Sequence, residues 1–140
     1  MEFVLLGPIL ILLLVAMVDF GRAFDAWVVS TNAAREGARY ASIYATKDYL
    51  TTAQVQTMSQ QKACAYLTAG LGSRGDVVKP AANNCTAPDL DIGNVTVSVP
   101  SRVPGEPVTV TVTVRVQIWA LMSFFLSNEA TLTGEATMRI

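Results

Sequence analysis

The sequence predicts an α+β protein with a long N-terminal helix, a second helix and a small antiparallel sheet of about three strands. Three observations support this fold class. Residues 3–18 form an uncharged apolar run. Apolar side chains then recur every three or four residues as far as Ala45, which is the spacing of a helix face. In the last third, valine alternates with polar residues, which is typical of strands.

Composition excludes several functional classes. The net charge of −1 provides no basic patch for a nucleic acid. The absence of histidine removes the commonest general base and the commonest metal ligand at neutral pH. No Ser-His-Asp set is possible, and no phosphate-binding or dinucleotide-binding motif occurs. We therefore expect a protein that is not an enzyme and that needs no metal or cofactor.

The apolar run has the character of a membrane span. Its 16 residues, Phe3 to Val18, give about 24 Å of helix against a hydrocarbon core of about 30 Å. A signal peptide is disfavoured because no Lys or Arg precedes Arg22, and the helical pattern continues. The missing basic flank suggests that a basic leader has been removed. We expect residues 1–22 to form a transmembrane or filament-core half, and residues 23–140 an extracytoplasmic domain.

Three residues near the N-terminus are candidates for assembly. Glu2 either lies in the headgroup region at little cost or neutralises a positive charge, such as an α-amino group of its own or a neighbouring chain. Gly7 and Pro8 interrupt the run, and Pro8 is expected to kink or locally unwind the helix. The backbone groups released there would need neighbours, which favours a packed bundle over a lone span.

We expect one helix from Glu2 to Ala45, about 65 Å long, and a second over residues 52–69. Thr51 and Gln54 fit a capping box at the start of the second helix, and Gly70 and Gly72 are expected to end it. The first helix should bury an apolar stripe, and the second a weaker face. The stripe consists of Phe20, Ala23, Phe24, Trp27, Val28, Thr31, Ala34, Ala38, Ala41 and Ala45, and the weaker face of Val55, Met58, Ala65 and Leu67.

The two cysteines, Cys64 and Cys85, allow one intrachain pairing. An extracytoplasmic disulfide is predicted, and two unpaired buried thiols are the alternative. Asn84 and Asn94 each begin an Asn-X-Thr triplet, which makes both possible glycosylation sites.

Two alternating stretches, residues 95–99 and 108–116, flank a turn that contains Pro104 and Gly105. They predict an antiparallel hairpin, and residues 131–140 predict a third strand. The valine face of this sheet needs a cover, for which the alanine-rich half of the first helix is the nearest partner. The apolar segment Ile118–Leu126 is either a short buried helix or a patch for a neighbouring subunit or a membrane surface.

Several motifs together resemble a known family. Glu2-Phe3 is followed by the apolar run, by Val18-Asp-Phe-Gly-Arg22 and by the small-residue stretch Asn32–Ala41, and the chain closes with Ala136-Thr-Met-Arg139. This combination is similar to the TadE-like pilins of the tight-adherence pilus system. One feature differs from the family pattern. Pilin glutamates lie further from the mature N-terminus than Glu2 lies from the start of this sequence.

The resemblance implies a pilin or minor pilin of a type IV pilus-related, cell-surface filament that supports surface attachment. Its partners would be copies of itself or other pilins, the membrane before assembly, the pilus assembly machinery and a prepilin peptidase that removes a short leader. Glu2 would pair with a subunit N-terminus. The alternative is a single-span membrane-anchored domain that acts as a binding or adhesion module, with the helix only as its tether.

Overall fold

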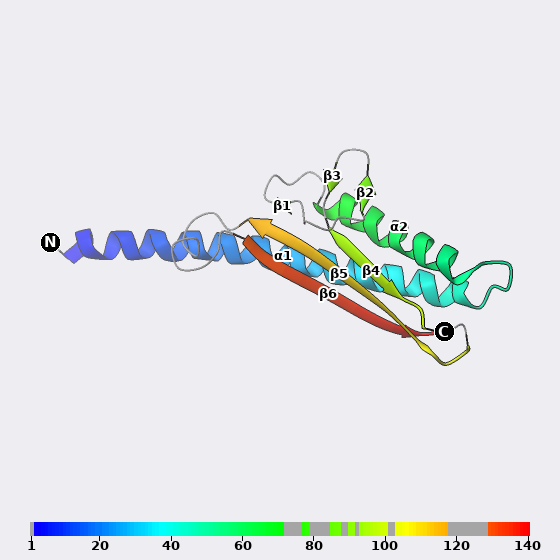
Figure 1. Ribbon diagram of the computed structural model, residues 1–140. Coiled ribbons are helices and arrows are strands. Elements are labelled where there is room, and N and C mark those ends of the chain that lie inside the picture. Colours follow the sequence, from blue (N-terminus) through cyan, green and yellow to red (C-terminus); the bar gives the residue numbers. More distant parts are fainter. Residues whose placement is uncertain are drawn as a thin grey trace.

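The computed structural model describes residues 2–71, 77–78, 85–87, 90–91, 93–100, 103–117 and 129–140. The fold is α+β, as predicted, and the N-terminal half of the first helix projects beyond the rest of the chain (Figure 1). The elements are α1 (Glu2–Ala45), α2 (Thr52–Leu71), β1 (Val77–Val78), β2 (Thr86–Ala87), β3 (Leu90–Asp91), β4 (Asn94–Ser98), β5 (Pro107–Gln117) and β6 (Glu129–Arg139).

The sheet is built around β5. Strand β6 runs antiparallel along the whole of β5 on one edge, while β4 and the short β1 pair with its other edge. Strands β2 and β3 form a separate antiparallel pair. The predicted β4–β5 hairpin is confirmed, and Gly105 in its turn has a positive φ of 97°, a conformation that glycine adopts without steric cost. The third strand begins at Glu129, two residues earlier than predicted.

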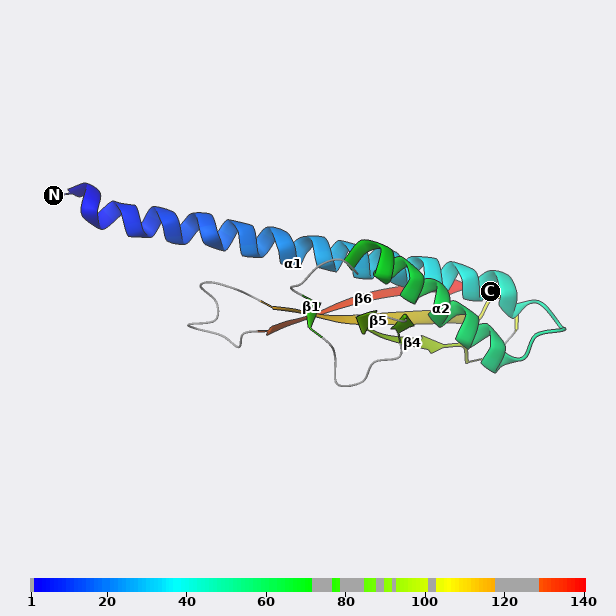
Figure 2. The same cartoon turned by 90° about the horizontal axis from the view of Figure 1, so that it is seen from above.

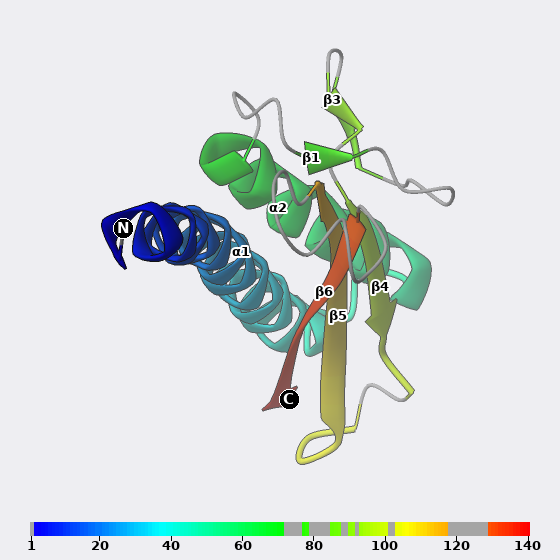
Figure 3. The same cartoon turned by 90° about the vertical axis from the view of Figure 1, so that its left-hand side faces the viewer.

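Both helices lie on one face of the sheet and form a second layer, as two perpendicular views show (Figures 2 and 3). The alternation of β5 places its five valines toward this layer, and all five are buried; they are Val108, Val110, Val112, Val114 and Val116. Opposite them, α1 contributes buried alanines from Ala33 to Ala45. Full burial of one valine side chain stabilises a fold by about 1.5 kcal/mol or more. The predicted cover of the valine face is therefore present.

Small residues let the two layers approach closely. A Cβ built on Gly134 of β6 would lie 2.6 Å from the backbone of Ser30 and Thr31 in α1. Between the helices, a Cβ on Gly70 would lie 2.6 Å from Val29. The buried hydroxyl of Ser59 donates a hydrogen bond to the carbonyl oxygen of Gly37. A larger residue at either glycine would force the elements apart.

The second helix begins with the predicted capping box. The backbone N–H of Thr51 donates to Oε1 of Gln54 at 2.8 Å, and the N–H of Gln54 donates to Oγ1 of Thr51 at 3.3 Å. The helix runs two residues past the predicted end, to Leu71, so Gly70 lies inside it. Gly70 therefore serves the contact with Val29 and does not stop the helix.

The predicted buried face of α2 was partly wrong. Val55 and Leu67 are buried, but Met58 is only partly buried and Ala65 is exposed. The buried residues follow each other at intervals of four, and they are Val55, Ser59, Ala63, Leu67 and Leu71. A row of i, i+4 residues is one of the ridges by which helices pack. The middle of this row is occupied by the small residues Ser59 and Ala63. A prediction from apolarity alone expects larger side chains at buried positions and therefore misses them.

The predicted stripe of α1 was also only half right. Its C-terminal half is buried at Ala34, Ala38, Ala41 and Ala45, but Phe20, Phe24 and Trp27 are exposed. Near them the buried residues are Ala26, Ser30 and Ala33. The buried residues there lie on another side of α1 from the three rings, and at Val29, Ser30 and Thr31 the close approaches of Gly70 and Gly134 leave no room for a large side chain.

The helix continues through Pro8 without interruption, so the local unwinding predicted there is not observed. Two further expectations, the structure of Ile118–Leu126 and the site at Asn84, fall outside the described residues.

The backbone contact at Gly134 makes a testable prediction. Gly134→Ala should destabilise the fold by about 1–3 kcal/mol, because its methyl group has to displace backbone atoms of α1. Urea unfolding of the full chain in detergent micelles, followed by circular dichroism, measures the loss. Gly21→Ala is the matched control, since a Cβ at Gly21 meets no atom within 4 Å. Equal stability of the two variants would contradict the proposed packing.

Candidate membrane-anchoring and assembly site

The projecting half of α1 carries a large uncovered apolar surface. Nine large apolar side chains between Leu6 and Val18 are 47–66% exposed. They occur on every side of the helix, and the most apolar 18-residue window, of mean hydropathy 1.9, has no buried residue. A helix that is apolar all round belongs in lipid or among other helices. By length and composition, α1 has one segment able to cross a membrane.

The predicted assembly residues lie at the far end of this surface. Glu2 is the first residue of α1, and Gly7 and Pro8 lie within the helix, about 8–9 Å further along. A Cβ on Gly7 would meet no atom within 4 Å, and Pro8 is exposed. Proline has no N–H to reach the carbonyl of Val4, the residue four positions earlier. The open space around Gly7 also shows that no contact within the described part of the chain requires a glycine at this position.

Where the apolar run ends, charged and aromatic residues alternate along α1. Asp19, Arg22 and Asp25 are spaced at intervals of three, and each makes an interaction with another group. Phe20, Phe24 and Trp27 form a continuous aromatic stripe, with ring centroids 6.3 Å apart for the first pair and 5.8 Å apart for the second. The helix thus changes character within two turns, from uniformly apolar to mixed.

Cys64 and Cys85 are joined by a disulfide, with their Cα atoms 5.2 Å apart. The bond ties the middle of α2 to the residue before β2. Cys85 is buried and Cys64 is half-buried. Asn94, the possible glycosylation site within the described residues, is half-buried at the start of β4, opposite Thr113 of β5.

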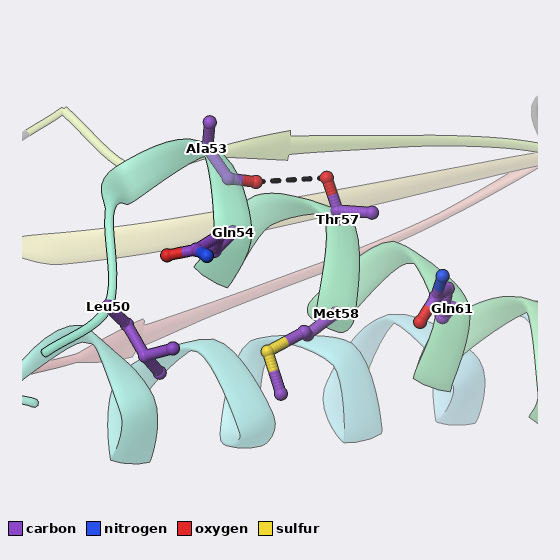
Figure 4. Close-up of a pocket in the computed structure, with 6 residues that line it drawn as sticks. All are labelled: Leu50, Ala53, Gln54, Thr57, Met58 and Gln61. Atoms are coloured by element: carbon purple, nitrogen blue, oxygen red, sulfur yellow. Dashed lines mark hydrogen bonds between the residues drawn. The ribbon is translucent and has the colours of Figure 1, made fainter.

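Two hollows lie along the helix layer. The larger, of about 410 Å³, is lined by uncharged residues: Leu50, Ala53, Gln54, Thr57, Met58 and Gln61. Figure 4 shows Leu50 and Met58 on the same side of α2, with Thr57 Oγ1 turned back to donate a hydrogen bond to the carbonyl of Ala53 at 2.9 Å. No residue that lines this hollow is ionisable, and the half-buried Met58 lies here instead of in the core.

The second hollow, of about 280 Å³, combines aromatic and charged residues. The rings of Tyr40 and Tyr44 stack at 4.3 Å, and Lys62 Nζ lies 5.6 Å from the centroid of Tyr40. The pKa of Tyr40 is raised above its ordinary value of 10.0, first by desolvation and then by a hydrogen bond with Tyr44. The fold therefore favours the neutral phenol of Tyr40. The contribution of this group to the stability of the fold is present below about pH 10 and is lost as the pH rises through its raised pKa.

Among the described residues, no group of three His, Cys, Asp or Glu side chains is placed to hold a metal ion. The surface that stands out physically is therefore the projecting half of α1, together with the aromatic stripe beside it.

Comparison with known families points to the same helix. Residues 1–39 match the family of TadE-like proteins. The match confirms the resemblance over the motifs between Glu2 and Arg39 and agrees with a membrane-anchor-like N-terminal helix. It ends within α1, before α2 and the sheet begin. No curated protein and no solved structure matches the chain.

Sequence reasoning missed the outward position of the aromatic stripe, although one signal was present. Along the predicted stripe, large rings at Phe20, Phe24 and Trp27 give way to alanines from Ala34 onward. Because interiors are filled to uniform density, such an abrupt change in residue size along one face indicates that the surroundings of the face also change.

The disulfide predicts a result for thiol chemistry. Protein that is denatured without reductant should react with no thiol reagent, because both cysteines of the chain are joined. Reduction, or Cys64→Ser with Cys85→Ser, should lower the free energy of unfolding by about 3 kcal/mol, the loop-closure value for a loop of this size. Mass spectrometry counts the labels, and two labels per unreduced chain would contradict the pairing.

Proposed function

We propose that this protein is a structural subunit, a pilin or minor pilin, of a type IV pilus-related filament at the cell surface. On this proposal it performs no catalysis. Residues 1–22 anchor the precursor in the membrane and later lie in the filament core, while residues 23–140 face outward and support surface attachment. The observation that carries the proposal is the uncovered apolar half of α1, Leu6 to Val18, which is rigidly continuous with the helix packed in the domain.

Physical chemistry limits what can surround this half-helix. Each fully buried Leu or Ile side chain is favoured by about 1.5–3 kcal/mol over the exposed state. The projecting surface therefore has to be covered, first by lipid and then by neighbouring helices. Because the apolar residues surround the helix, it can pack against several neighbours at once. Repetition of one such contact by a rotation that does not close gives a helical filament.

Glu2 supplies the specific contact in this proposal. In a filament core nearly free of water, an unpaired carboxylate is expensive, so it requires a partner of opposite charge. The α-amino group of an adjacent subunit is the natural partner, since the nearest basic residue of the same chain is Arg22, about 30 Å along the helix. Gly7 and Pro8 would let neighbouring helices approach closely and satisfy the carbonyl that proline leaves without its helical donor.

The second candidate function is a membrane-anchored binding module, in which α1 is only a tether. The hollow beside Tyr40, Tyr44 and Lys62 favours it, because stacked rings and charged groups there form a mixed surface suited to a ligand. Electron microscopy of purified protein separates the two functions, as a subunit forms filaments and a tethered module gives isolated particles.

The charge-pairing step predicts the behaviour of two Glu2 variants. Glu2→Ala should leave the domain folded and its disulfide intact but reduce incorporation into filaments. Glu2→Lys should reduce it further, because it places like charges together. The measurement is the ratio of protein in sheared filaments to protein in the membrane fraction of producing cells.

Glu106→Lys is the matched control. It makes the same change of charge on the exposed turn at the opposite end of the molecule from Glu2, and it should assemble like the wild type. Wild-type incorporation of Glu2→Lys would exclude charge pairing, whereas complete absence of filaments in the wild type would exclude the filament role itself.

A further inference from the structure

The aromatic stripe Phe20, Phe24 and Trp27 is exposed at the point where α1 leaves its apolar half. The exposed fractions of the three side chains are 73%, 53% and 44%. Residues spaced by four and then three lie on one side of a helix, and the two ring contacts confirm that these three side chains form one surface. Within the described part of the chain, no element covers this surface, although an apolar surface of this kind needs a cover.

The position of the stripe along α1 matches one layer of a bilayer. About 20 residues are needed to cross a hydrocarbon core of about 30 Å, so a span that starts at Phe3 reaches the edge of this core near Arg22. Phe24 and Trp27 then lie about 3 Å and 7.5 Å beyond the edge, within an interfacial layer about 5–8 Å thick. Phe20 lies just inside the hydrocarbon.

Two of the three charged residues fit the same placement, because Arg22 lies at the edge of the hydrocarbon core and Asp25 about 4.5 Å beyond it, whereas Asp19 lies just inside the core like Phe20. Asp19, Arg22 and Asp25 interleave with the stripe within two turns of α1. A dry contact between subunits would have to strip water from all three charged groups. The headgroup layer accepts charged groups and aromatic rings together, and aromatic side chains concentrate at that depth.

We infer that Phe20, Phe24 and Trp27 form an interfacial anchor, which binds the headgroup layer on the outer side of the lipid bilayer. The inference rests on the membrane-anchored precursor of the proposed function. It adds how deeply α1 lies in the bilayer and which side of the helix faces the headgroup layer. Because the rings occupy one side only, α1 tilts toward that side, as anchored helices commonly do by about 20°. The domain, continuous with α1, is thereby held in one orientation over the membrane before assembly.

Tryptophan fluorescence tests this depth in the full chain. The chain has two tryptophans, so Trp119→Phe leaves Trp27 as the single reporter. The protein is reconstituted into phosphatidylcholine vesicles that carry a nitroxide either near the headgroup or near the end of the acyl chain. The shallow nitroxide should quench Trp27 about twofold more strongly than the deep one, as expected for an interfacial ring.

Two reporters made in the background Trp27→Phe, Trp119→Phe serve as controls. Leu13→Trp places the ring in the middle of the apolar run and should be quenched mainly by the deep nitroxide. Tyr49→Trp, an exposed position in the connection between α1 and α2, should be quenched by neither. Circular dichroism and thiol labelling check that each variant keeps its fold and disulfide.

The outcomes separate this inference from the proposed function. If Leu13→Trp is quenched and Trp27 is not, the anchoring stands and the interfacial stripe is wrong. A Trp27 emission that is blue-shifted but unaffected by either nitroxide means that another copy of the chain covers the stripe, which also overturns the inference. If Leu13→Trp is unquenched as well, the membrane anchor itself fails.

Discussion

The close contact between α1 and the sheet is the constraint on which the rest of this structure depends. The valines of β5 can be buried only if a helix lies close above them, and that closeness requires alanine, serine and glycine where the elements meet. At Gly134 the two layers are so close that a Cβ built there would lie 2.6 Å from the backbone of Ser30 and Thr31. This contact fixes α1 on the sheet from Ala26 to Ala45 and leaves everything before it free to project.

The projection follows from the continuity of the helix. Residues 2–45 form one helix without a break, so the apolar half and the packed half share one axis. Any tilt or rotation imposed on the apolar half by lipid or by neighbouring helices is passed to the domain, because no flexible loop separates them. In a filament, the same rigidity would convert one repeated contact between helices into a regular arrangement of domains.

Periodicity predicted most of the fold because it reports the environment of each segment directly. The two alternating strands, the capping box of Thr51 with Gln54 and the extent of α1 all follow from local patterns of side chains. The errors occurred where packing distance decides between candidates. Ser59 is buried while Met58 is not, because the helices meet closely there and the Ser59 hydroxyl finds the carbonyl of Gly37.

The candidate site was predictable in composition but not in geometry. An uncharged apolar run followed by Asp19 and Arg22 is visible in the sequence, and it indicates a membrane or filament environment. The outward direction of Phe20, Phe24 and Trp27 could not be obtained in this way, because the helical period places them in line with the buried alanines. The structure shows that the packed face at this level lies on another side of the helix, where Ala26 and Ser30 are buried.

The two halves of α1 differ in what they contribute to the fold, and in the proposed function only the first half takes part in assembly. Among the described side chains, the buried core begins at Ala26, and the large apolar residues from Leu6 to Val18 contribute nothing to it. The free energy that stabilises the domain therefore comes from the valine face, the alanines of α1, the buried residues of α2 and the disulfide, while the apolar surface of the projecting half remains uncovered within the described part of the chain. Because the two halves draw on different contacts, the assembly step of the proposed function, in which neighbouring helices replace lipid around the first half, would leave the packing of the second half undisturbed.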